Sequence, residues 1–182
     1  MLPEDLDPPD RRLPALRWIV ALLLVLGMAS CVGKGANGVA DPKLQESRLP
    51  GFGEIGIRVE PGAARAAADW CALLAATDAQ RARGLMQVTD LKGYAGMLFR
   101  FATDSQGGFW MKDTPMPLSI AFFAADGSFV SATDMDPCVG KGDSCPVYSA
   151  AGAYRYALEV PKGQLPSLGV GPGSRLAVRG PC

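Results

Sequence analysis

Hydrophobic and polar residues alternate in short runs over the second half of the chain, a period of two that is typical of β-strands. Residues 154–160 alternate most strictly, with large apolar side chains at the even positions and smaller or charged ones, including Glu159, at the odd positions. The runs at residues 118–124 and 128–133 are joined through Asp126-Gly127, which predicts a hairpin. Further apolar runs predict strands at residues 66–76, 97–101 and 175–179.

Helix signals are few. Thr77 and Gln80 have the spacing of a capping box, in which each side chain bonds the backbone N–H of the other residue. This helix is expected to end near Gly84, and residues 162–168 predict one more helical turn. Many short strands with one or two short helices predict an α+β, mainly β domain with an antiparallel or mixed sheet.

The stretch at residues 107–120 combines aromatic, charged and hydroxyl side chains and ends in two prolines. If it forms a strand, Trp110, Lys112 and Thr114 project from one face. This face is predicted to bind a small anionic or carbohydrate ligand. Trp110 would stack on the ligand, Lys112 would hold a carboxylate and Thr114 would form a hydrogen bond.

These residues also have a structural interpretation. Lys112 could cover apolar surface with its stem and pair with Glu159, because a partly buried lysine needs a partner. Arg83 is a second candidate anion contact, or a charge that complements the helix dipole. Glu159 is accordingly either the partner in an ion pair or a general acid.

The N-terminal part of the chain has the pattern of an export signal. Residues 18–28 are continuously apolar and follow several arginines, and this run is too short to span a membrane, which needs about 20 residues. Small residues precede Cys31, as in bacterial lipoproteins, where this cysteine is acylated and anchors the protein to the outer face of a membrane. Secretion with cleavage near Ala40 and an uncleaved anchor are alternatives. The chain is predicted to divide into a lipoprotein-type signal peptide, a flexible tether and a folded domain, at residues 1–31, 32–52 and 53–182.

Composition excludes several functions. Lysine plus arginine balance aspartate plus glutamate at 18 each, so no basic field exists and nucleic acid is not an expected partner. Histidine is absent, which removes Ser-His-Asp and Cys-His catalysis and the commonest metal ligand. No cofactor and no metal are predicted.

The chain has five cysteines. With Cys31 carrying lipid, the other four predict two disulfides in an exported domain. Cys138 and Cys145 flank a glycine-rich stretch that could fold back, and Cys71 would then bond to Cys182. A metal or redox site is the alternative, but no Cys-x-x-Cys spacing supports it.

Several motifs occur together in the order and spacing of one family. They are Arg83–Met86, Gly96–Phe99, Phe109–Thr114, Pro117-Leu118, Asp126-Gly127, Tyr156–Glu159 and Gly171–Leu176. Over residues 65–180 the chain resembles the DUF192 (UPF0127) family, and the stretch at residues 137–148 is similar to cysteine-bearing exported members. The resemblance implies a compact, barrel-like, mainly β domain, often exported or membrane-anchored, with no established activity.

Two classes of function follow. The first is an envelope-anchored lipoprotein that binds a small ligand or an envelope protein. The second is an enzyme acting on cell-envelope glycan or peptide, with Glu159 and Asp113 as an acid–base pair. Members of the family usually carry an aspartate where this chain has Ser119, which favours the first class. A purely structural spacer is a third alternative.

Overall fold

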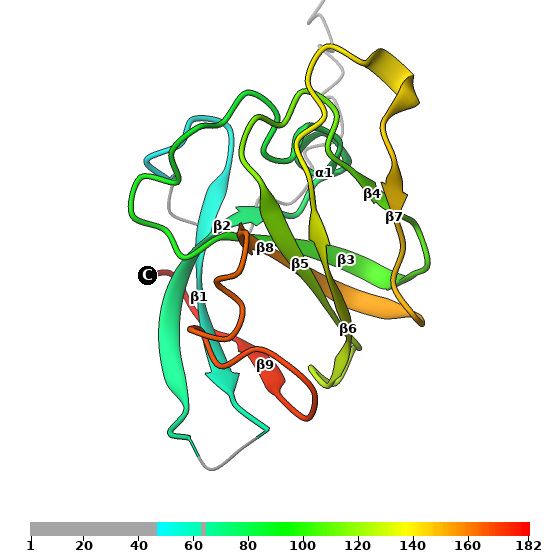
Figure 1. Ribbon diagram of the computed structural model, residues 1–182. Coiled ribbons are helices and arrows are strands. Elements are labelled where there is room, and N and C mark those ends of the chain that lie inside the picture. Colours follow the sequence, from blue (N-terminus) through cyan, green and yellow to red (C-terminus); the bar gives the residue numbers. More distant parts are fainter. Residues whose placement is uncertain (1–46, 63–64) are drawn as a thin grey trace, which may run out of the picture. The chain divides into compact units, whose positions relative to one another are not determined.

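The computed structural model describes residues 47–62 and 65–182, which form a mainly β fold with one α-helix among them (Figure 1). The described residues form two helical elements, α1 (Asp78–Arg83) and the 3₁₀ turn η1 (Gly142–Ser144). The strands are β1 (Gly53–Glu60), β2 (Ala68–Ala75), β3 (Met97–Ser105), β4 (Phe109–Trp110), β5 (Leu118–Phe123), β6 (Phe129–Met135), β7 (Val147–Tyr148), β8 (Tyr154–Pro161) and β9 (Arg175–Val178). The predicted mainly β class is confirmed. Within the described ranges, no helix is long and apolar enough to cross a bilayer.

Seven strands form one mixed sheet in the order β6–β5–β8–β3–β2–β1–β9, and β4 and β7 form a separate two-stranded ribbon. Only β2 and β3 pair in parallel among these strands, because α1 and the segment after it carry the chain back to the start of β3. At this return, Gly96 lies against β8. A Cβ at Gly96 would come within 2.1 Å of the Glu159 carbonyl oxygen, so the close approach requires glycine.

The short helix α1 is fixed at both ends. The Thr77 hydroxyl accepts a hydrogen bond from the Gln80 N–H, and the Gln80 side chain accepts one from the Thr77 N–H, which confirms the capping box. At the other end the Gly84 N–H bonds the Gln80 carbonyl. Because α1 has no buried residue, these bonds rather than packing define where it begins and ends.

The large sheet is not a closed barrel, which corrects the barrel-like expectation. Its edge strands β6 and β9 are not paired along their length and meet through an isolated bridge between Ser128 and Arg175. Gly127, in the predicted hairpin turn, makes this contact with a φ of 84°. A Cβ there would lie 2.1 Å from the Leu176 carbonyl oxygen, so the edges can meet only at glycine.

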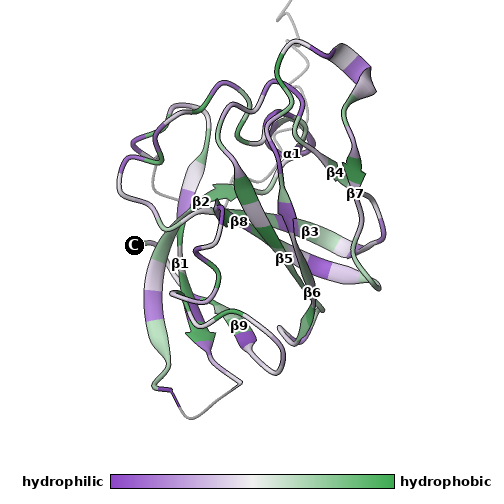
Figure 2. Cartoon of the chain, viewed as in Figure 1, coloured by the Kyte–Doolittle hydropathy of each residue, from purple (hydrophilic) through white to green (hydrophobic). Residues whose placement is uncertain are grey.

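Both faces of the sheet are covered by apolar side chains. Strand β5 is buried over all six of its residues, and Figure 2 shows it hydrophobic over most of its length. One face carries a core that includes Leu73, Met97, Phe99, Ile120, Phe122 and Ala157. The other carries Leu74, Leu98, Ala121, Phe123, Leu158 and Val160. Glu159 pairs with Met97 and Ile120 across its two neighbouring strands and therefore belongs to the first face.

Residues 107–120 do not form one strand, contrary to the prediction. Strand β4 covers only Phe109 and Trp110, and pairing resumes at Leu118 in β5. Between them Asp113 has a φ of 50°, in the left-handed region, which turns the chain. The alternation that would place Trp110, Lys112 and Thr114 on one strand face therefore stops after Trp110.

The predicted signal peptide, Cys31 and most of the predicted tether lie outside the described residues. The last part of the tether, residues 47–52, is described and folds against the domain. Phe52 is only 2% exposed and joins the first core, and the Ser47 N–H donates to its carbonyl oxygen.

Both predicted disulfides are present. Cys71 in β2 bonds to Cys182, with Cα atoms 5.7 Å apart, and Cys138 bonds to Cys145, with Cα atoms 5.9 Å apart. The first bond closes a sequence separation of 111 residues and the second a separation of 7. The two bonds therefore constrain the unfolded chain very differently.

Replacing Cys71 and Cys182 together with alanine is expected to lower the free energy of unfolding by about 5 kcal/mol, because the long loop gains the most chain entropy when opened. The double replacement of Cys138 and Cys145 serves as the matched comparison and should cost about 2–3 kcal/mol. Urea unfolding of both variants and the wild type measures this difference. An equal loss in the two variants would contradict the expectation.

Candidate functional site

A cavity of about 240 Å³ lies between α1, the first core face of the large sheet and residues 107–114, which include β4 and are called the β4 segment below. Its lining combines apolar, aromatic and ionisable side chains, which is the usual composition of a ligand site. Three of the predicted ligand-binding residues, Arg83, Trp110 and Thr114, line it together with Glu159. The remaining lining residues are Arg81, Ala82, Gly84, Leu85, Met86, Phe99, Phe101, Ser105, Gly107, Gly108, Phe109 and Tyr154.

Glu159 is the buried ionisable group of this cavity. It lies in the middle of β8, between β3 and β5, and is only 4% exposed. Across residues 47–62 and 65–182 its carboxyl has neither a hydrogen-bond partner nor a salt-bridge partner. Burial disfavours the charged form and raises the pKa of Glu159 from 4.5 to about 8. At neutral pH the carboxyl is therefore mainly protonated.

Aromatic rings pack around the cavity and hold one another in edge-to-face contacts. The centroids of Phe99 and Phe109 are 5.0 Å apart, and those of Phe101 and Tyr154 are 5.3 Å apart. The Tyr154 hydroxyl donates a 2.7 Å hydrogen bond to the Gly107 carbonyl, which positions the turn that leads into β4. The walls are thus fixed by the sheet and by this bond.

The helix supplies two arginines to the rim. Arg81 donates to the carbonyls of Ala76 and Arg100, pairs with Asp78 and lies over the Phe101 ring. Its guanidinium is therefore already engaged by protein groups.

Arg83 is exposed and uses one nitrogen, Nη1, to donate to the Pro50 carbonyl at 3.0 Å. Its guanidinium lies 4.9 Å from the centre of the Phe52 ring. A guanidinium has five N–H donors, so Arg83 keeps donors for an anion at the cavity mouth.

Lys112 does not pair with Glu159, which corrects that alternative. Its Nζ lies 2.6 Å from a carboxylate oxygen of Asp143, in the disulfide-closed loop, and 5.0 Å from the centre of the Trp110 ring. This hydrogen bond to Asp143 raises the pKa of Lys112. Lys112 is not among the residues that line the cavity; it lies outside, against a face of the 40% exposed Trp110.

Asp113 does not line the cavity either. Its backbone holds the segment in place, because its N–H donates to the Cys138 carbonyl and its carbonyl accepts from the Gln87 N–H. The proposed acid–base pair of Glu159 and Asp113 is therefore not gathered in this cavity.

Ser119 belongs to the opposite side of the sheet from Glu159. It pairs across strands with Asp134, and its hydroxyl donates a 2.5 Å hydrogen bond to the Asp134 carboxylate. The same hydroxyl accepts a bond from the Gly163 N–H. A carboxylate is thus present next to position 119, supplied by the neighbouring strand, and it does not line the cavity.

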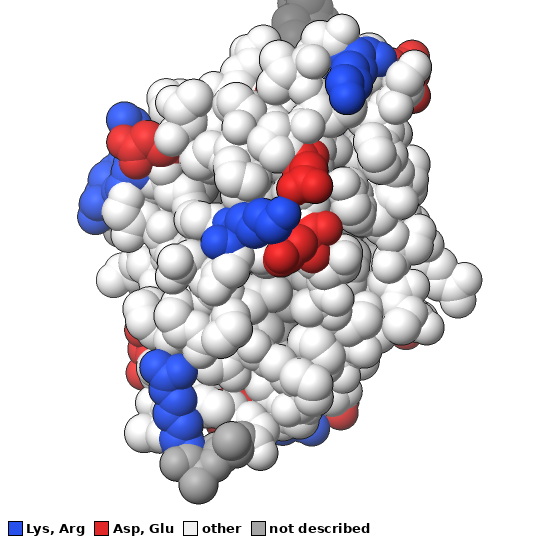
Figure 3. Space-filling model, in the orientation of Figure 1, with Lys and Arg blue, Asp and Glu red and all other residues white. Residues whose placement is uncertain are grey.

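Charged side chains outside the cavity are mixed in sign. Figure 3 shows basic and acidic residues side by side on one face, separated by wide uncharged areas. Among the salt bridges of the described residues, Lys162 Nζ lies 2.6 Å from a carboxylate oxygen of Asp136. Basic and acidic residues are therefore mixed on this face as they are balanced in the whole sequence.

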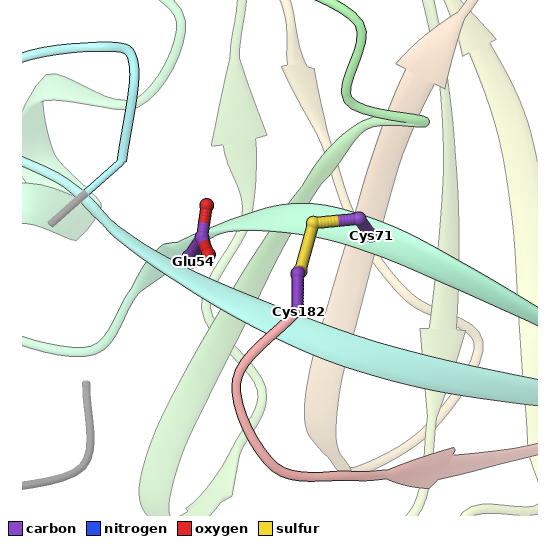
Figure 4. Close-up of side chains that lie close together, drawn as sticks. All are labelled: Glu54, Cys71 and Cys182. Carbon is purple, nitrogen blue, oxygen red and sulfur yellow. A yellow bond between two sulfur atoms is a disulfide. The ribbon is translucent and has the colours of Figure 1, made fainter. Parts of the chain in front are cut away.

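One group of potential metal ligands occurs in the described part of the chain, formed by Glu54, Cys71 and Cys182 (Figure 4). Metals bind cysteine as thiolate, and here the two sulfur atoms are bonded to each other. The Glu54 carboxylate instead accepts a 2.6 Å hydrogen bond from the Tyr94 hydroxyl. The cluster as it stands offers one carboxylate, too few ligands for a metal site.

The fold and the motifs define a DUF192 domain. The model of this family, described as "Uncharacterized ACR", matches residues 62–178. This is more than half of the chain, so the chain belongs to the DUF192 family. No curated protein matches it.

Two crystal structures share the fold. A Sinorhizobium meliloti 1021 protein, named as a proposed transcription regulator, has 29% sequence identity and a TM-score of 0.61, over 70% of this chain and 95% of that one. A protein of unknown function from Novosphingobium aromaticivorans DSM 12444 has 26% identity and a TM-score of 0.63, over 74% and 91% of the two chains.

The raised pKa of Glu159 predicts how stability depends on pH. The unfolded chain releases this proton near pH 4.5 and the folded chain near pH 8. Between these values only the folded state keeps the proton, so stability falls as the pH rises. Compared with Glu159→Gln, the wild type is expected to lose up to about 1.4 kcal/mol of unfolding free energy per pH unit in this range.

Urea unfolding at several pH values between these limits measures the effect. Glu60→Gln is the matched control, because Glu60 is an exposed acid on β1, and its profile should run parallel to that of the wild type. If the Glu159→Gln profile is also parallel, Glu159 does not hold its proton in the folded state.

Proposed function

We propose that this chain is an exported lipoprotein, anchored by acylated Cys31, whose DUF192 domain binds a small ligand in the Glu159 cavity. The observation that carries the binding role is that residues from three separate segments line one cavity. Arg83 comes from α1, Trp110 and Thr114 from the β4 segment, and Glu159 from the centre of the sheet.

The exposed part of the site suits an anionic or carbohydrate group. Trp110 is partly exposed while lining the cavity, so its ring can stack on a ligand ring at the mouth. Arg83 is exposed, lines the same cavity and retains donors for a carboxylate. A cavity of about 240 Å³ suits a small ligand rather than a polymer segment.

Binding is favoured over hydrolysis. Two-carboxylate glycosidases place both acids around the scissile bond, and Glu159 is the one carboxyl among the lining residues. The name transcription regulator was given to the Sinorhizobium meliloti protein and is not carried over to this chain. In this chain the balance of 18 basic and 18 acidic residues gives no overall positive charge to attract nucleic acid.

The binding role is tested with a panel of soluble fragments that includes monosaccharides, sugar acids, carboxylates and amines, using ligand-observed NMR on the full-length chain. At least one class is expected to bind, and Trp110→Leu and Arg83→Gln should weaken it roughly tenfold, since stacking and charged hydrogen bonds contribute about 1–3 kcal/mol.

Val139→Ala and Arg179→Gln are the matched controls. Both residues are exposed and neither lines the cavity. A panel without any binder that depends on Trp110 or Arg83 would overturn the binding role.

The lipid anchor is tested separately by metabolic labelling with palmitate. The wild-type chain is expected to incorporate label and to sediment with membranes, whereas Cys31→Ala should lose the label, because the thiol is the site of acylation. Equal labelling of Cys31→Ala would contradict the anchor.

A further inference from the structure

The unpaired carboxyl of Glu159 indicates what the inner end of the ligand must supply. Buried ionisable groups in proteins are normally paired or hydrogen-bonded, because an unpaired one carries a desolvation cost. Glu159 is 96% buried, lines the cavity and has no partner of either kind within the described ranges. In the folded protein Glu159 avoids this desolvation cost by keeping its proton. A ligand that brings a positive charge would let the carboxyl ionise without that cost.

The cations near the cavity do not serve this purpose. Arg81 is held by two carbonyls and Asp78, and Lys112 is held by Asp143. Arg83 donates to the Pro50 carbonyl and lies over the Phe52 ring, so it does not pair with Glu159 either. Burial is the cause of the raised pKa of Glu159, with no charged neighbour contributing. The complementary charge must therefore come from outside the domain.

The surroundings of Glu159 suit an organic cation better than a metal ion. A metal needs several oxygen, nitrogen or sulfur ligands, whereas this cavity is walled by the rings of Phe99, Phe109 and Tyr154. Aromatic faces attract ammonium groups, and rings around a quaternary ammonium form a recurrent recognition site.

We infer that the cavity binds a small organic ammonium compound, with its cationic head between the aromatic rings and against the Glu159 carboxylate. The inference rests on the proposed ligand-binding function and names the class of ligand. The anionic contact at Arg83 completes the arrangement, because Glu159 is buried at the floor and Arg83 is exposed at the mouth. A ligand with an ammonium group at one end and a carboxylate at the other satisfies both.

The inference is tested with two probes of nearly equal shape, choline and its neutral isostere 3,3-dimethylbutan-1-ol. Isothermal titration of the full-length chain at about pH 8.5 should show choline binding roughly tenfold more tightly than the alcohol, in the range of a desolvated cation–π and ionic contact. Glu159→Gln should abolish this preference and leave the alcohol unaffected. Glu60→Gln is the control for loss of one negative charge and should keep the preference.

The choline affinity should also rise roughly tenfold or more between about pH 6.5 and pH 8.5, because the ligand needs the ionised carboxylate. The other groups that face the cavity do not change charge in this range. Arg81 and Arg83 from α1 stay cationic, and burial raises the pKa of Tyr154 on β8 above its ordinary value of 10. Choline carries a charge that does not change with pH, so the pH dependence of its affinity reports ionisation of the protein.

Thermal unfolding of Glu159→Gln checks that this variant is folded. Trp110→Leu leaves Glu159 at the floor of the cavity intact and should weaken choline binding. Equal binding of choline and the alcohol, or a choline affinity that is independent of pH, would overturn the ammonium inference. So would the absence of choline binding when other fragments bind in a Trp110-dependent manner. In each of these cases the proposed binding role stands and only the ammonium inference fails. If no fragment binds, both the binding role and the ammonium inference fail.

Discussion

The pairing of β8 between β5 and β3 is the constraint on which the rest of the domain depends. This strand contributes apolar residues to both cores, and it carries the one acidic side chain that lines the cavity. Gly96 lets the chain pass close enough to β8 for β3 to start beside it. An ionisable group at the centre of such a sheet is held by strand pairing on both sides, and its position cannot adjust to relieve its burial.

The sequence pattern predicts those elements whose signals are local. Strand β8, the turn at Gly127 and the cap at Thr77 each depend on a few neighbouring residues, and all three are present. The predicted alternation holds from Tyr156 to Val160, whereas Tyr154 packs in the first core with Ala157, where the pairing of β3 with β8 shifts register. Strand β1 carries a similar alternation in Ile55, Ile57 and Val59, all buried, a signal that the strand predictions do not use. The failure at residues 107–120 has a local cause in the left-handed turn at Asp113, which hydrophobic alternation does not reveal.

The site is only partly predictable for a different reason. Arg83, Trp110 and Glu159 are far apart in the chain, and the strand order brings them to one cavity. Sequence alone selects them as chemically notable residues but offers Glu159 as the candidate protein partner of Lys112. The actual partner, Asp143, lies in a loop held by the Cys138–Cys145 bond, and such a pairing depends on tertiary structure. The walls of Phe99, Phe109 and Tyr154 are likewise typical core residues in the sequence, and only their placement makes them part of a site.

The position of β9 has a consequence for how the domain folds. This C-terminal strand pairs with β1, the first strand of the sheet, and Cys182 beyond it bonds to β2. Contacts between such distant parts of a chain make folding slow, because a long loop must close before they form. Until residues 175–182 are available, β1 keeps an unpaired edge, so the sheet cannot be completed while the chain is still emerging. Protection of the β1 edge by β9 is therefore the last step in completing the sheet.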